Sequence, residues 1–95
     1  FTGATSAVKP GAKFAAFGSS KFAQRGLAQA MARELGPQGI HVAHVILDGV
    51  IWAQGEDEAG TLKAEAIAAS YLHLIQQDRS AWTFELDLRP DVERF

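Results

Sequence analysis

Phe17 and Lys21 are the first residues whose spacing suggests chemistry, because they lie four positions apart in the stretch FAAFGSSKFAQRGLAQAMARELG, residues 14–36. Residues four apart in an α-helix are offset by only about 40° and project from the same face. A hydroxyl and an ammonium group placed in this way can cooperate, but the phenyl ring of Phe17 carries no hydroxyl. Spacing alone favours a structural interpretation, in which Phe17 packs in a core and Lys21 extends its amine to water.

Two loop segments carry further polar groups. Thr5 and Ser6 lie in TGATSAVKPG, residues 2–11, and each supplies a hydroxyl donor. The same hydroxyls serve equally well to cap loop backbone. The segment DGVI, residues 48–51, has the composition of an ordinary turn after a strand, with Gly49 at positive φ. The residue types therefore leave both a catalytic and a local structural role open.

The remaining candidates point more weakly to function. His41 and His44 are three apart in an apolar segment that we expect to be a strand, so they face opposite sides and do not suit one metal ion. His73 stands alone, and buried structural histidines are commoner than ligands at such spacings. The acidic run 56–58 is typical of a solvated loop. Trp82 is expected to pack at a sheet edge or a subunit contact.

A long helix must position Lys21. Residues 12–35 are good helix formers, and Gly36-Pro37 is a strong stop signal. Small residues form a stripe along this helix, while large apolar residues fall elsewhere around it. A helix that is apolar on more than one side is buried on more than one side. We therefore expect one face to pack on a sheet and another on a second helix.

The rest of the chain alternates strands and helices. Residues 40–47 are almost continuously apolar, which is typical of a central parallel strand, and residues 83–88 alternate as in a half-covered strand near an edge. The order is a strand end, helix 12–35, strand 40–47, helix 61–77 and strand 83–88. This pattern predicts an α/β fold with right-handed crossovers in a doubly wound parallel sheet. Since the first strand is nearly missing, we expect residues 1–95 to be a single partial domain of a longer protein, or to associate with copies of itself.

Composition excludes several classes. The 95 residues carry a net charge of −2 without a basic or aromatic stripe, so neither a nucleic-acid nor a membrane-surface partner is expected. No apolar run approaches the roughly 18 residues of a membrane span. Cysteine is absent, which excludes disulfides and thiol nucleophiles and fits a reducing cytoplasm. We expect a cytoplasmic protein.

Taken in order, TGATSAVKPG and FAAFGSSKFAQRGLAQAMARELGPQGIHVAHVILDGVI resemble the C-terminal half of the short-chain dehydrogenase/reductase superfamily. The resemblance extends to the late segment QQDRSAWTFELDLRP and implies a Rossmann-type fold, NAD or NADP as cofactor, and dimers or tetramers. In that family a Ser precedes a Tyr-x-x-x-Lys helix. The Tyr exchanges a proton with the substrate oxygen, the Lys holds the nicotinamide ribose and lowers the Tyr pKa, and the Ser polarises the substrate oxygen.

Carried over residue by residue, the resemblance implies that Lys21 is the family Lys and that Phe17 stands at the Tyr position. The family Ser falls on Thr5 if one gap is allowed, or otherwise on Ser6; we prefer Thr5. The lost hydroxyl is a serious departure, because a positioned general acid contributes a factor of about 10²–10⁴ in rate. The single tyrosine, Tyr71, lies in the second predicted helix, too far along to replace it.

On the cofactor side, Asp48-Gly49 stands where the family usually has Pro-Gly. Ile51 matches the residue whose backbone meets the nicotinamide carboxamide, and Ala53 takes a position that often holds a phosphate-binding Thr. The glycine-rich phosphate loop of the family does not occur in residues 1–95.

The resemblance implies the C-terminal part of an NAD(P)-dependent oxidoreductase that acts on a small alcohol or carbonyl substrate, with an atypical site. This chain alone is expected to be inactive. Two other hypotheses remain: a degenerate protein that binds a dinucleotide or a partner without turnover, and an assembly module. Homo-oligomers are expected to form through helix 12–35 and strand 83–88.

Overall fold

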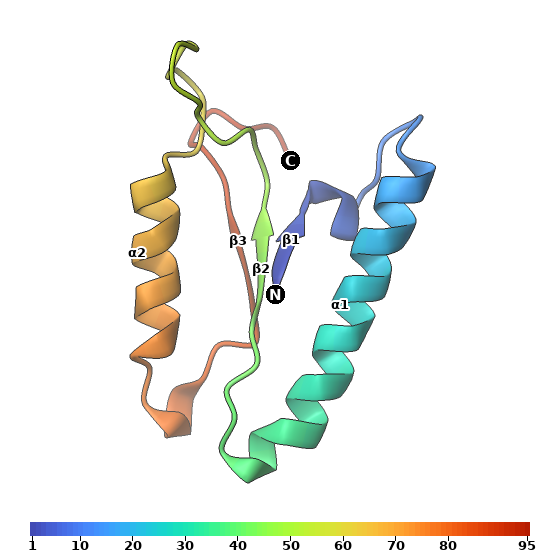
Figure 1. Ribbon diagram of the computed structural model, residues 1–95, viewed down its shortest axis with the longest axis vertical. Helices are drawn as coiled ribbons and strands as arrows, with labels where there is room; N and C mark the ends of the chain where they lie inside the picture. Colours follow the sequence, from blue (N-terminus) through green and yellow to red (C-terminus); the bar gives the residue numbers. More distant parts are fainter.

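A three-stranded parallel sheet, in the order β1-β2-β3, forms the centre of the computed structural model, which describes residues 1–95 (Figure 1). The strands are β1 (Thr2–Ala4), β2 (His44–Leu47) and β3 (Glu85–Leu88). Val45 of β2 pairs with Thr2 on one side and with Leu86 on the other, both in parallel register. The prediction of a central parallel strand followed by an edge strand is confirmed.

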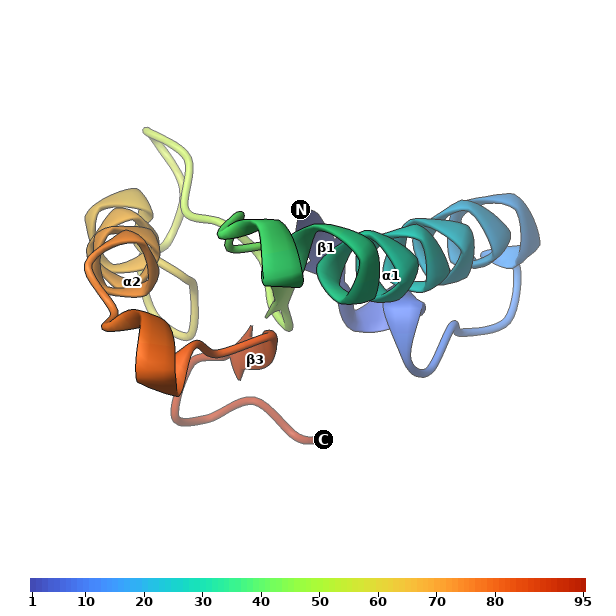
Figure 2. The ribbon, with the colours of Figure 1, turned by 90° about the horizontal axis from the view of Figure 1, so that it is seen from below.

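Two helices lie on opposite sides of this sheet, α1 (Ala15–Leu35) and α2 (Ala64–Ile75), as Figure 2 shows from below. The side chains of β2 explain the arrangement, since His44 turns toward the α1 side and Val45 toward the α2 side. The α1 and α2 helices therefore do not pack on each other, and the packing of another face of α1 on a second helix stays a prediction. None of the helices has the length and apolar character that crossing a membrane requires.

Each predicted element is shorter in the structure, and local geometry explains why. The first helix begins at Ala15, not at residue 12, because Lys13 has a left-handed φ of 71° that no helix admits. The second strand begins at His44, not at residue 40, and its first residue pairs with Glu85 of β3. The last strand begins at Glu85, which pairs with His44.

The second helix also begins later than predicted, at Ala64 instead of residue 61. Leu62 forms a parallel bridge with Ile51, in which Leu62 N–H donates to the Val50 carbonyl and Trp52 N–H to the Leu62 carbonyl, both at 2.8 Å. This bridge ties the loop after β2 to the start of α2. The helix ends at Ile75, two residues before the predicted end.

A charged cluster holds α1 against the sheet. Arg25 makes two hydrogen bonds to Glu85, from Nε to Oε2 at 2.9 Å and from Nη2 to Oε1 at 2.7 Å. The His44 ring, which is fully buried, lies with Nδ1 2.9 Å from Glu85 Oε2. Its Nε2 has no partner and faces Gly3, where an added Cβ would lie 2.2 Å away. Gly3 is thus required because the ring occupies the space of a side chain.

The edge of β1 that faces away from β2 is open. The Phe1 carbonyl accepts from Val45 N–H on β2, so the Thr2 carbonyl points to the other side. Lys21 of α1 reaches this carbonyl with its Nζ at 3.1 Å. Large apolar side chains of α1 and of the residue before it are also exposed: Phe14, Phe17, Phe22 and Leu27.

Candidate active site

A cavity of about 480 Å³ lies where β1 and β2 end, at the edge of a parallel sheet where open α/β folds bind ligands. Its lining includes Thr5 and Ser6, from the turn that follows β1, and Leu47 and Gly49, from the end of β2. Phe17 reaches it from the first turn of α1. The fold thus brings together four of the residues singled out from the sequence: Thr5, Ser6, Phe17 and Gly49.

Asp48 lies behind this cavity and is only 4% exposed. Thr5 Oγ1 donates to Asp48 Oδ1 at 2.6 Å, and Arg89 Nε donates to Asp48 Oδ2 at 3.2 Å. The Thr5 hydrogen bond holds the pKa of Asp48 below its ordinary value, with smaller contributions from Arg89 and Lys9, whereas burial acts in the opposite direction. Asp48 is therefore ionised at neutral pH.

Phe17 is 46% exposed in this chain. The Lys21 ammonium lies 5.6 Å from the centre of its ring, a distance at which a cation is attracted to an aromatic face. Lys21 Nζ also donates to the Thr2 carbonyl and to Gln24 Oε1, at 3.1 and 3.3 Å. Its amine therefore sits beside the ring at the open edge of β1, in a separate shallow hollow that it lines with Ser20 and Gln24.

The turn after β2 positions Gly49 and Ile51. A Cβ on Gly49 would lie 2.9 Å from Pro90 Cδ, so glycine is required by close packing. Its φ is positive, as expected, and at 159° is nearly extended. In the bridge to Leu62, the hydrogen bonds are made by the residues on either side of Ile51. The N–H and C=O of Ile51 therefore point away from Leu62. Ala53 is exposed in the same loop.

Sequence reasoning missed Arg89 as part of this site. Arg89 follows directly after β3, whose carboxyl end lies at the same edge of the sheet as those of β1 and β2. It also pairs with Asp87 and stacks over the Phe95 ring at 3.8 Å. The rule that parallel strands end together, applied to the Arg-Pro after the third strand, would have found it.

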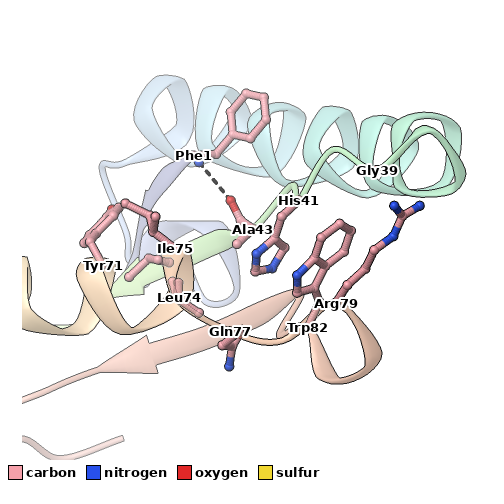
Figure 3. A pocket seen from close by; sticks show the side chains of 11 residues that line it. Phe1, Gly39, His41, Ala43, Tyr71, Leu74, Ile75, Gln77, Arg79 and Trp82 are labelled. Atoms are coloured by element: carbon pink, nitrogen blue, oxygen red, sulfur yellow. Dashed lines mark hydrogen bonds between the residues drawn. The ribbon is translucent and has the colours of Figure 1, made fainter.

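The weaker candidates lie elsewhere. Tyr71 is on α2, where its hydroxyl bonds with the Thr2 hydroxyl, on the opposite side of the sheet from α1. His41 stacks on Trp82 with ring centres 4.6 Å apart. Both rings line a second cavity of about 450 Å³ between α2 and the sheet, with Phe1 and Ile75 (Figure 3). No group of three or more His, Cys, Asp or Glu side chains has the arrangement of a metal site.

Comparison with known proteins agrees with these features. Residues 1–55 match the family model described as short chain dehydrogenase, and the chain belongs to this family. It is similar to the crystal structure of a short-chain dehydrogenase from Rhodopseudomonas palustris, with 48% sequence identity and a TM-score of 0.79. That match covers 95% of this chain and 36% of the other, so this chain spans about a third of its length. The search of curated proteins found no match.

Proposed function

We propose that residues 1–95 are the C-terminal part of a larger Rossmann-type domain, in an oxidoreductase that transfers a hydride between NAD or NADP and a small alcohol or carbonyl compound. Family membership supports the reaction class. The open edge of β1 and the exposed apolar side chains of α1 support the larger domain, because both are surfaces that a complete sheet would cover.

The observation that carries this proposal is the cavity at the carboxyl ends of β1 and β2. Thr5 and Phe17 meet there, and the Lys21 ammonium lies beside the Phe17 ring. A substrate oxygen placed in this cavity would meet hydroxyl groups from the turn after β1. The Phe17 ring would pack against the carbon skeleton of the substrate and exclude water from it.

The residues present fit a nicotinamide cofactor. The unpaired N–H and C=O of Ile51 offer one donor and one acceptor, which is the complement of a primary carboxamide. Lys21 supplies a cation suited to ribose hydroxyls, and Gly49 keeps the turn free of a side chain. When bound, the cofactor supplies the hydride acceptor or donor. Its phosphates would be held by residues outside this chain, because residues 1–95 contain no glycine-rich turn between a strand and a helix.

A second function, dinucleotide binding without turnover, is favoured by one observation. Phe17 cannot exchange a proton, and the phenol of Tyr71 is engaged with Thr2 on the other face of the sheet. A protein with this site would keep the cofactor cradle and the cavity while lacking the usual acid.

Titration of the full-length protein with NADH and NADPH, followed by fluorescence, tests for cofactor binding. Hydride transfer to a panel of ketones and aldehydes then separates an enzyme from a binding protein. We expect saturable binding, and slow turnover that rises by about tenfold or more in Phe17→Tyr, since a positioned acid contributes a factor of about 10²–10⁴. Tight binding with no turnover in either protein would favour the second function, and no binding would remove both.

We also propose that the full-length protein is a homo-oligomer that uses α1 and β3. Phe22 and Leu27 are about half exposed on α1, and β3 is an edge strand with one unpaired side. Light scattering on the full-length protein tests this proposal, and a monomer at high concentration would contradict it.

A further inference from the structure

The hydrogen-bond direction at Thr5 limits what the cavity can bind. A threonine hydroxyl has one proton and two lone pairs, whereas an ionised carboxylate only accepts. The 2.6 Å contact between Thr5 Oγ1 and Asp48 Oδ1 therefore uses the Thr5 proton. A ligand in the cavity meets an oxygen that can accept a hydrogen bond and has no proton left to donate.

The surroundings of Asp48 keep it as the acceptor of the hydrogen bond from Thr5. It is 4% exposed, and its second oxygen accepts from Arg89 Nε at 3.2 Å. Lys9 adds a positive charge on the side of the turn that follows β1, and Asp87 pairs with Arg89 from the solvent side. Because the pKa of Asp48 is lowered, its side chain is a carboxylate at neutral pH and can only accept the hydrogen bond from Thr5.

Thr5 lines the cavity, while Asp48 is not among the residues that do so. We propose that Asp48 is a positioning residue that turns the Thr5 hydroxyl into a hydrogen-bond acceptor, so that the site prefers the alcohol form of its ligand over the ketone form. An alcohol donates its proton to Thr5 Oγ1, whereas a ketone oxygen would face the lone pairs of Thr5. This inference rests on the proposed function for the choice of alcohol and ketone as ligands.

Cyclohexanol and cyclohexanone are suitable probes, because they have nearly the same shape and differ in the donor. Their dissociation constants are measured on the full-length protein by ligand-observed NMR, with no cofactor added. We expect the alcohol to bind about tenfold more tightly, because a ketone oxygen leaves the Thr5 lone pairs without a donor. Equal affinities, or tighter binding of the ketone, would overturn the inference.

Asp48→Asn is the decisive variant. Arg89 requires an acceptor, so the amide oxygen stays with Arg89 and the amide NH₂ faces Thr5. Thr5 then accepts from the amide and its proton is released toward the cavity, so the preference is expected to vanish or reverse. The matched control is Asp87→Asn, which removes a different carboxylate from Arg89 and leaves the bond between Thr5 and Asp48 intact. An unchanged preference in Asp48→Asn, or equal changes in both variants, would contradict the proposal.

A second pair of variants keeps the test decisive if Asp48→Asn fails to fold. Thr5→Val removes the hydroxyl at nearly constant shape, so it should abolish the preference, and Thr5→Ser should preserve it. Since binding is measured without cofactor, the preference can be found in a protein that has no oxidoreductase activity. Turnover of alcohols together with equal binding of the two probes would sink this inference and leave the proposed function standing.

Discussion

Two arginine–carboxylate pairs lie on neighbouring strands of the same sheet and do different things. Glu85 pairs with Arg25 under α1, and Asp48 pairs with Arg89 at the carboxyl end of β2. In both, the pKa of the carboxyl is lowered: by the Arg25 hydrogen bond for Glu85, and first by the Thr5 hydrogen bond for Asp48. The pairs differ in their third partner, which is the buried His44 ring in one and the cavity-lining Thr5 in the other.

Position in the sheet, and not residue type, therefore distinguishes the pair that joins two elements from the pair that borders the cavity. Glu85 lies at the start of β3, where α1 covers it and every hydrogen-bonding partner belongs to the chain. Asp48 lies where the strand stops and the backbone turns away, so its partner Thr5 opens on a cavity. The first pair joins elements, and the second holds a hydroxyl that lines a cavity.

Gly3→Ala should disrupt the contact between His44 and Glu85, and we expect it to lower the free energy of unfolding more than any other variant proposed here. The new methyl group would lie 2.2 Å from His44 Nε2, so the ring must leave its place beside Glu85. Such overpacking costs about 1–3 kcal/mol, and we expect a loss near the upper end of that range. Urea unfolding of the full-length protein measures it. Gly36→Ala is the control, because a methyl group added there would have no neighbour within 4 Å; equal behaviour of the two variants would show that the His44 ring has room to move.

Replacing each carboxylate by its amide sharpens the comparison. Both oxygens of Glu85 accept from Arg25, so Glu85→Gln must place an NH₂ against a guanidinium N–H and should cost about 2 kcal/mol. Asp48 presents only one oxygen to Arg89, so Asp48→Asn can satisfy both neighbours and should cost less than about 1 kcal/mol. Urea midpoints measure both values. A reversed order would mean that Asp48 is the main structural pair.

The loss of folding stability at acidic pH should depend on both carboxylates. Their pKa values are lower in the folded protein than in the unfolded chain, where Asp and Glu titrate at about 3.9 and 4.3. The folded state therefore binds fewer protons, and the stabilisation is present above the unfolded values and lost as pH falls through the folded ones. Urea unfolding between about pH 2 and 6 should show a shallower loss in Glu85→Gln and in Asp48→Asn. A curve as steep as wild type in both variants would place the acid sensitivity in other groups.

Thr5→Val should raise the pKa of Asp48, because it removes the largest of the causes that lower it. Carbon-13 NMR of the Asp48 carboxyl group measures this shift directly. The same variant should leave the pKa of Glu85 unchanged, since Thr5 makes no contact with that pair. A shift at both carboxyl groups would indicate a general rearrangement of the sheet.

The smallest effect is expected at a third pair, Lys63 and Glu58, whose Nζ and Oε1 atoms are 2.6 Å apart on the surface. Both side chains are more than half exposed, and such pairs contribute little in water. Lys63→Ala should leave the melting temperature within experimental error. A clear decrease would show that exposure is a poor guide to the strength of these pairs.

Much of the fold followed from periodicity and stop signals. The continuous apolar run ending at Leu47 predicted the central parallel strand, and Gly36-Pro37 predicted the end of α1. The starts of elements were less predictable, because they depend on distant partners and on single residues such as Lys13, whose left-handed φ has no sequence signature. The segment that covers the exposed apolar face of α1 could not be predicted either, since an apolar face does not reveal which segment covers it.

The candidate site was partly predictable. Parallel strands end at one edge, so Thr5, Phe17 and Gly49 could be expected near each other. The direction of the bond from Thr5 to Asp48 could not, because it depends on which way two short side chains turn across neighbouring strands. Lys21 was expected in the same crevice, and the structure places its amine slightly apart, against the Thr2 carbonyl.

The open edge of β1 has a practical consequence for work on this segment. An unpaired parallel strand templates the addition of further strands, and the single amine of Lys21 guards only one of its carbonyl groups. Recombinant residues 1–95 are therefore expected to associate increasingly as their concentration rises. A short strand fused before Phe1 and designed to pair with the exposed edge of β1 should reduce this association.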